Sequence, residues 1–316
     1  MTPATAPRVW QHRHMSGTGH YENFPVASWL CPPRLRPPIL ALYRYARTAD
    51  DLADEGQVSA PDRLAALARF RSALARALAD QPPERGAWPE VFGPLQTQIQ
   101  KHQLPAAPLH ALLDAFEQDV RDTAQGVHPP NMAALLDYCS RSANPIGRLL
   151  LHLYGVRDTT ALVQSDAVCS ALQLVNFWQD LGQDLRRSRH YLPSDWVRAH
   201  GVDRGELTRW AVGSATAAEA NTGPAQALVA GLCEHARDLM RQGAPLALAL
   251  PGRLGWELRL VVQGGLLVLD RMAEGGWRTW SHRPRLGRTD GPRLLWRAAT
   301  MAWRTNTPTG PQRQPL

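Results

Sequence analysis

The chain is organised around residues 169–193, which read CSALQLVNFWQDLGQDLRRSRHYLP. Asn176, Asp180 and Asp184 recur every four residues, and in an α-helix this spacing turns each side chain by about 40° and raises it by roughly 6 Å from the one before. The three side chains therefore form one stripe of oxygen atoms, which suits Mg²⁺. The alternative is a solvated polar face on a helix whose buried side comprises Leu172, Val175, Leu181 and Leu185.

A second acidic cluster lies in residues 43–56, which read YRYARTADDLADEG. Asp50 and Asp54 are one helical turn apart, with Asp51 beside them and Arg47 one turn before. Like charges at this spacing destabilise a helix, so their presence favours a bound cation. Two such helices facing each other would hold Mg²⁺ ions and a phosphate-bearing substrate. For Arg47, pairing with the acids of its own helix is the alternative.

These motifs, with Gln173 before the second and RHYLP at 189–193 after it, resemble those of the squalene/phytoene synthases. The resemblance extends from about residue 20 to about residue 277. Residues 20–28 (HYENFPVAS) and 138–147 (YCSRSANPIG) differ from most of the family and are similar to its hydroxysqualene synthase branch, from bacterial hopanoid pathways. Membership of that branch implies conversion of presqualene diphosphate and water to hydroxysqualene and diphosphate.

The resemblance implies a single-domain, all-α class I isoprenoid synthase bundle around a central cavity. We expect it at residues 20–277, after a disordered leader (1–19) and before a basic extension (278–316) with a disordered end. Composition also favours helices, because alanine, leucine and arginine dominate and aromatic residues make up 7% of the chain. The implied cofactor is a cluster of two or three Mg²⁺ ions. NADPH is not expected, since water rather than hydride ends the reaction.

The resemblance also implies roles for individual residues. The resemblance implies five metal ligands: Asp50, Asp54, Asn176, Asp180 and Asp184. The four acids among them are also implied to be catalytic. Residues implied to contact the diphosphate are His20, Arg47, Arg189 and Tyr191, and those implied to line the cavity are Phe24, Tyr43 and Gln173.

Tyr138 and Asn144 are the expected catalytic residues near the reacting carbons. A tyrosine stabilises a nearby cation through its ring and orients water through its hydroxyl, although a buried core tyrosine is the alternative. Pro145 removes a backbone donor and disfavours helical geometry at Asn144, so we expect a local break there. We hypothesise that Asn144 holds the water that captures the carbocation.

The formal net charge of +7 and the isoelectric point near 9.7 ask for an explanation. Basic and aromatic residues are interleaved late in the chain: Trp277, Arg278, Trp280, Arg283, Arg285, Arg288, Arg293, Trp296, Arg297, Trp303 and Arg304. Such a mixture suits peripheral contact with anionic lipid, and it suits an ordinary arginine-rich soluble surface equally well. Nucleic acid is a third partner for this charge, but the chain has no recognition motif for it.

The four cysteines are far apart and form no C-x-x-C pair, so neither a zinc site nor a disulfide framework is indicated. We therefore expect a reducing cytoplasm, with the inner face of the membrane as a second location. No stretch approaches 18 unbroken apolar residues, so no membrane span is expected. Neighbouring hopanoid-pathway enzymes are further candidate partners.

Three other functions remain open. Within the family they are a presqualene diphosphate synthase and a complete squalene or phytoene synthase, which condense two prenyl diphosphates; the residues from Ser142 to Pro145 argue against both. The third function belongs to a different class, in which the chain would be a non-catalytic helical partner in an isoprenoid enzyme complex. Intact acids in both motifs argue against that function.

Overall fold

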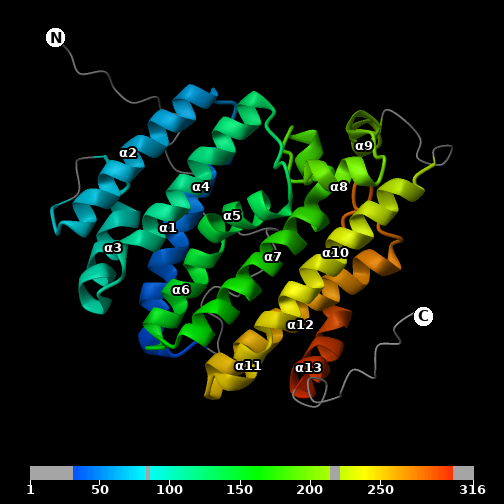
Figure 1. Cartoon of the computed structure of the whole chain (residues 1–316). Helices are drawn as coiled ribbons and strands as arrows, with labels where there is room; N and C mark the ends of the chain where they lie inside the picture. The colour runs from blue at the N-terminus through cyan, green and yellow to red at the C-terminus, as the bar shows by residue number, and fades with distance from the viewer. Residues whose placement is uncertain (1–30, 83–85, 214–220, 302–316) are drawn as a thin grey trace, which may run out of the picture.

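The computed structural model describes residues 31–82, 86–213 and 221–301 of the 316-residue chain, and all regular elements within them are helical (Figure 1). The α-helices are α1 (Arg36–Asp54), α2 (Ala60–Leu78), α3 (Pro89–His102), α4 (Ala106–Gln125), α5 (Met132–Ser142), α6 (Asn144–Leu153), α7 (Thr159–Arg186), α8 (Ser194–Ala199), α9 (Arg204–Ala211), α10 (Gly223–Gly243), α11 (Pro245–Ala249), α12 (Gly252–Glu274) and α13 (Gly291–Ala299). The expected all-α fold is confirmed. Across these ranges no helix is both long and apolar enough to cross a membrane.

Helix α7 lies in the middle of the bundle and contacts α5, α6, α10 and α12 (Figure 1). It begins after Asp158, whose carboxylate accepts a hydrogen bond of 2.8 Å from the backbone N–H of Ala161. Such a cap satisfies one of the donors left free in the first turn of a helix. The apolar side of α7 is buried as predicted, and it comprises Leu172, Val175, Leu181 and Leu185.

Helix α1 begins with prolines in its first turn and ends at Asp54. The fully buried Tyr45 donates a hydrogen bond of 2.8 Å from its hydroxyl to the backbone carbonyl of Leu109 in α4. The Tyr45 ring also stacks on Phe70 of α2, with centroids 5.4 Å apart. These contacts fix the apolar side of α1 against α2 and α4, which leaves its acidic side for a cavity.

The helical path breaks between α5 and α6. Ala143 has φ −122° and ψ −48°, outside helical geometry, and Pro145 occupies the first turn of α6. Proline suits this position because the first N–H groups of a helix have no partner inside it. The predicted break is present, but it lies at Ala143, one residue earlier than expected, and Asn144 is already the first residue of α6.

The segment that follows α12 packs tightly against α7 at Gly182. A Cβ atom at Gly182 would lie 2.2 Å from the carbonyl oxygen of Trp280, so only glycine allows this approach. Trp280 itself is completely buried. The expectation that Trp280 lies at a lipid interface is therefore wrong, because this indole fills the core instead.

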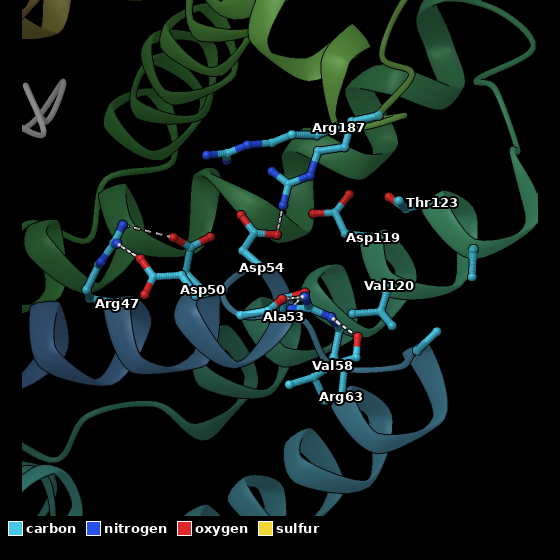
Figure 2. A pocket seen from close by; sticks show the side chains of 15 residues that line it. Arg47, Asp50, Ala53, Asp54, Val58, Arg63, Asp119, Val120, Thr123 and Arg187 are labelled. Atoms are coloured by element: carbon cyan, nitrogen blue, oxygen red, sulfur yellow. Dashed lines mark hydrogen bonds and ion pairs between the residues drawn. The ribbon is translucent and has the colours of Figure 1, made fainter. Parts of the chain in front are cut away.

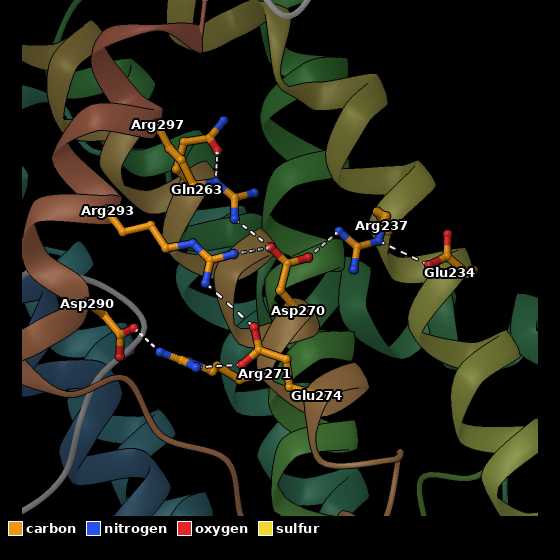
Figure 3. A network of polar contacts seen from close by, with 9 residues as sticks. All are labelled: Glu234, Arg237, Gln263, Asp270, Arg271, Glu274, Asp290, Arg293 and Arg297. Carbon is orange, nitrogen blue, oxygen red and sulfur yellow. Dashed lines mark hydrogen bonds and ion pairs between the residues drawn. The ribbon is translucent and has the colours of Figure 1, made fainter.

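Helix α13 is held against α12 by a network of ion pairs (Figure 3). Arg297 donates a hydrogen bond of 2.5 Å to Asp270, which also accepts one of 3.0 Å from Arg237 of α10. Arg297 is buried, which corrects its expected place among the lipid-facing arginines. Leu295 and Trp296 remain exposed, at 59% and 68%.

Candidate active site

The main cavity lies between α1, α4, α5 and α7 and has two adjoining compartments of about 480 and 620 Å³. Asp50, Asp54 and Asp119 line both compartments. The sequence-predicted residues that line the first are Tyr43, Arg47, Asp50, Asp54, Tyr138, Gln173, Asn176, Asp180, Asp184, Arg189 and Tyr191. The structure thus brings the two acidic stripes to one cavity. His20 and Phe24 lie outside the described residues.

The α1 wall of the cavity is acidic with one arginine at its end. Figure 2 shows Asp50 and Asp54 projecting from α1 on the side where Asp119 of α4 lies. Arg47 binds Asp50 at 3.1 Å and Asp51 at 2.7 Å, both on its own helix. Arg47 therefore pairs with acids of its own helix, which is the alternative that the sequence left open. The same side chain also lines the cavity.

Two arginine side chains form ion pairs with carboxylates of the two acidic stripes. Arg189, which follows α7, forms an ion pair with Asp54 of α1 and so joins the two walls. Arg283 binds Asp180 of α7 through two nitrogen atoms, and its Nη2 lies 3.1 Å from Oδ2. A planar guanidinium fits a carboxylate and a phosphate with the same pair of donors. The cavity therefore places two guanidinium groups directly beside the acids.

The acidic stripes also suit a divalent cation. Burial raises the pKa of Asp184 well above its ordinary value, and the neighbouring Asp180 raises it further. In the described part of the chain, no three His, Cys, Asp or Glu side chains are already grouped closely enough to hold a metal ion. The donor set of carboxylate and amide oxygens nevertheless fits Mg²⁺, and a cation there would favour the ionised form of Asp184.

The partly buried carboxylate of Asp119 links the two tyrosines of the cavity. The Tyr138 hydroxyl donates a short hydrogen bond to Asp119 Oδ2, and the Tyr191 hydroxyl donates one of 3.2 Å to Oδ1. The Tyr191 ring stacks on Phe177 with centroids 3.9 Å apart. Burial raises the pKa of Asp119 to about 7, although both tyrosine hydrogen bonds lower it. Asp119 thus fixes both rings at the cavity wall.

Asn144 lies at the start of α6 and is buried. Its side-chain oxygen accepts a hydrogen bond of 2.9 Å from the hydroxyl of Ser170 in α7. Neither compartment of the main cavity includes Asn144 in its lining. The structure therefore gives Asn144 a packing contact between α6 and α7, and its role with water stays a prediction.

Nine residues that line the first compartment were not predicted as site residues, and the charged ones among them are Asp119, Arg187, Arg283 and Arg285. Asp119 lies on a helix with other acids, and its spacing does not distinguish it from a solvated residue. Arg283 and Arg285 were grouped with the lipid-facing arginines, and both instead line the cavity. Their distance in sequence from Asp180, 103 residues for Arg283, leaves no local pattern to detect.

Comparison with known proteins points to one family. The family model described as squalene/phytoene synthase matches residues 18–290. A hydroxysqualene synthase from Zymomonas mobilis is 41% identical over 62% of this chain and 63% of its own length, so the match spans less than two thirds of that relative. A hydroxysqualene synthase from Rhodopseudomonas palustris is 33% identical over 78% of each chain. The crystal structure of squalene synthase HpnC from Alicyclobacillus acidocaldarius is similar, with a TM-score of 0.70 and 31% identity over 82% of this chain and 90% of that one.

Proposed function

Because this chain belongs to the squalene/phytoene synthase family, we propose that it converts presqualene diphosphate and water to hydroxysqualene and diphosphate. The relatives named hydroxysqualene synthase support this reaction over others of the family. A diphosphate ester with a thirty-carbon chain needs a charged recess beside an extended cavity, and the two compartments of the main cavity supply both volume and charge.

The observation that carries the proposal is that the acidic stripes of α1 and α7 face one cavity with arginines between them. The residues that would hold two or three Mg²⁺ ions are Asp50, Asp54, Asn176, Asp180 and Asp184. When bound, Mg²⁺ neutralises the charge that develops on a diphosphate as its bond to carbon breaks. We include this metal in the proposal because the donor chemistry fits it.

Arginine side chains would bind the leaving group in this scheme. Arg189 and Arg283 exchange the carboxylates of Asp54 and Asp180 for diphosphate oxygens, since a guanidinium group donates hydrogen bonds equally well to a carboxylate and to a phosphate. The exchange frees both carboxylates at the moment when the diphosphate arrives. Arg47 and Tyr191 add further donors from opposite walls of the cavity, and His20 is the remaining candidate donor.

Tyr138 would guide the carbocation and its capture. The carbon–oxygen bond of the ester breaks and leaves its electron pair on the diphosphate, after which the cation rearranges. The ring face of Tyr138 stabilises positive charge nearby. One water oxygen then bonds to the carbon, and its proton passes to the diphosphate. Asn144 remains our prediction for positioning that water, and Asn144→Gly should lower the yield of alcohol without stopping diphosphate release.

The rival functions make different demands on the same cavity. A presqualene diphosphate synthase or a complete squalene or phytoene synthase accepts two prenyl diphosphates, whereas the proposed reaction uses one diphosphate ester and water. A non-catalytic partner needs no acids at all, yet five oxygen-bearing side chains of the two motifs line the main cavity. That lining argues for an enzyme.

We also propose that the chain works at the inner face of the membrane, where its long apolar substrate would be available. Exposed Leu295 and Trp296 on α13 and the net charge of +7 support this location. Contact with other hopanoid-pathway enzymes would follow from a shared membrane surface. Sedimentation with anionic vesicles tests the first part, and a protein that stays in the supernatant contradicts it.

Substrate choice tests the proposed reaction. Purified protein should release diphosphate from presqualene diphosphate in the presence of Mg²⁺ and should lose this activity when the metal is chelated. Farnesyl diphosphate, which an earlier-step synthase consumes, should remain unchanged under the same conditions. Consumption of farnesyl diphosphate with presqualene diphosphate left intact would overturn the proposal.

A further inference from the structure

A second, smaller cavity lies beside the main one, and we call it the side pocket. It has a volume of about 180 Å³ and lies between the end of α4, the loop at 127–130, the start of α5 and the segment at 190–191. This volume is more than ten times the roughly 10–15 Å³ that one water molecule needs. Asp122, Thr123, His128 and His190 give the side pocket a partly polar lining.

The side pocket and the main cavity share one wall. Asp119, Tyr138 and Tyr191 line both, and the two hydroxyls meet on the Asp119 carboxylate between them. Thr123 lies close to Asp119 on the same helix (Figure 2). At its other end the side pocket reaches the surface at Val127, which is 44% exposed. A small molecule could therefore pass from solvent to Asp119 without crossing the diphosphate site.

Among the lining residues, His128 indicates which kind of molecule suits the side pocket. Its Nδ1 is buried and finds no hydrogen-bond partner among the described residues. Burial, together with nearby Arg204 and His190, lowers the pKa of His128 to about 4, so the ring is neutral near pH 7. A buried polar atom without a partner is costly, and water in a polar cavity is the usual partner. The side pocket is thus suited to ordered water.

The proposed reaction needs a supply of water that reaches the carbocation at one place. A thirty-carbon substrate would cover much of the wall of the main cavity with apolar surface, and its diphosphate would lie beside the acids and arginines that line both compartments. Water that entered freely would meet the carbocation at several carbons. A narrow polar route that ends at one place on the cavity wall restricts capture to the carbon held there.

We propose that the side pocket stores water and delivers it through the wall formed by Asp119, Tyr138 and Tyr191 to the carbocation in the main cavity. This inference rests on the proposed function, because it concerns the source of the water in that reaction. The ligand is water alone, and the wall residues act by hydrogen bonding. The oxygen that enters the product therefore comes past α5 and not past the diphosphate.

Filling the side pocket tests this route. Ala134 lines the pocket from α5, and Ala134→Leu adds three carbons there; the neighbouring Ala133 is exposed and outside the lining, so Ala133→Leu is the matched control. Val127→Trp obstructs the outer end from an exposed position and does not depend on how the core repacks. The readout is the ratio of thirty-carbon alcohol to thirty-carbon hydrocarbon from presqualene diphosphate, at equal diphosphate release.

We expect a several-fold fall in this ratio for Ala134→Leu and for Val127→Trp, with the Ala133→Leu ratio equal to that of the wild type. Cations that receive no water lose a proton and leave as hydrocarbon. A wild-type ratio in Val127→Trp and in folded Ala134→Leu would overturn the water route while the proposed function stands. A wild-type protein that forms no alcohol would instead overturn the proposed function, and the water route with it.

Discussion

Asp119 joins more parts of the site than any motif residue does. It lies on α4, accepts hydrogen bonds from Tyr138 and Tyr191, and lines both the main cavity and the side pocket. The carboxylate of Asp119 is partly buried and has two hydroxyl donors, and desolvation disfavours its charged form more than these donors favour it. Its titration should therefore be visible in the stability of the protein.

The pKa of Asp119 is raised to about 7, whereas an aspartate in an unfolded chain has a pKa near 3.9. Between about pH 4 and pH 7 the folded protein therefore binds more protons, and the stability from this carboxyl is lost as the pH rises through about 7. Asp119→Asn should raise the melting temperature relative to the wild type more at pH 8 than at pH 5, in chelator.

The matched control is Asp238→Asn, which removes one exposed carboxylate from α10. Subtracting its effect corrects for the change in net charge. An Asp119→Asn difference that is the same at pH 5 and pH 8 would show that Asp119 ionises as an ordinary carboxylate.

Arg283 is the basic residue whose place in the cavity the sequence did not reveal. If it exchanges Asp180 for diphosphate, Arg283→Met should lower kcat/KM for presqualene diphosphate by about 10- to 100-fold, since a charge-assisted hydrogen bond contributes about 1.5–3 kcal/mol. Arg253 is exposed and lies outside the cavity lining, so Arg253→Met serves as the control. Equal kinetics for the two variants, both folded, would exclude Arg283 from diphosphate binding.

At the scale of the elements, the contact between Gly182 and Trp280 joins α7 to the segment that carries Arg283. Gly182→Ala forces a Cβ atom against the Trp280 carbonyl, 2.2 Å away, and should reduce the free energy of unfolding by about 1–3 kcal/mol or more. Gly264→Ala is the control, because a Cβ atom there meets nothing within 4 Å. It should stabilise α12 by about 0.5–1 kcal/mol. Urea unfolding of both variants measures the difference, and equal midpoints would contradict the close approach.

Helix α13 depends on Arg297. Removing one partner of a buried ion pair costs about 3–5 kcal/mol, and we expect the low end for Arg297→Ala because Asp270 is a quarter exposed. Arg293 contacts the same Asp270 at 3.9 Å from a half-exposed position, so Arg293→Ala should cost less than about 1 kcal/mol. Urea unfolding followed by limited proteolysis would show whether α13 detaches. Similar losses in both variants would contradict a special role for Arg297.

The sequence predicted those elements whose pattern is local. The four-residue spacing of the acids on α1 and α7, the apolar side of α7 and the break at Pro145 all depend on neighbours within one or two turns. The placements of Asp119, Arg283, Trp280 and Arg297 depend on contacts across the fold. Composition alone assigned Trp280 and Arg297 to lipid, since a sequence does not show which tryptophans and arginines the core absorbs.

At the scale of the whole molecule, two apolar cores frame the site. One is built on α1 to α4 and the other on α7, α10 and α12. The main cavity takes its acids from both, Asp50 and Asp54 from the first and Asp180 and Asp184 from the second. Arg189 forms an ion pair with Asp54 that joins these two walls, and an arriving diphosphate would replace the Asp54 carboxylate in this pair.

Several arginines of this basic molecule form ion pairs with its own carboxylates. Arg283, Arg297 and Arg271 pair with Asp180, Asp270 and Asp290, respectively. These side chains stabilise the packing of the late segments and are not free to meet lipid phosphates. The exposed apolar pair on α13, Leu295 and Trp296, is then the feature on which the proposed membrane location depends most.

In the proposed reaction water, and not hydride or a second prenyl diphosphate, reacts with the final carbocation. The most direct test of this reaction is to incubate the protein with presqualene diphosphate and Mg²⁺ in ¹⁸O-labelled water, without NADPH, and to identify the thirty-carbon product by mass spectrometry. We expect hydroxysqualene that carries one ¹⁸O atom. An unlabelled hydrocarbon as the sole product, or untouched presqualene diphosphate, would contradict the proposed reaction.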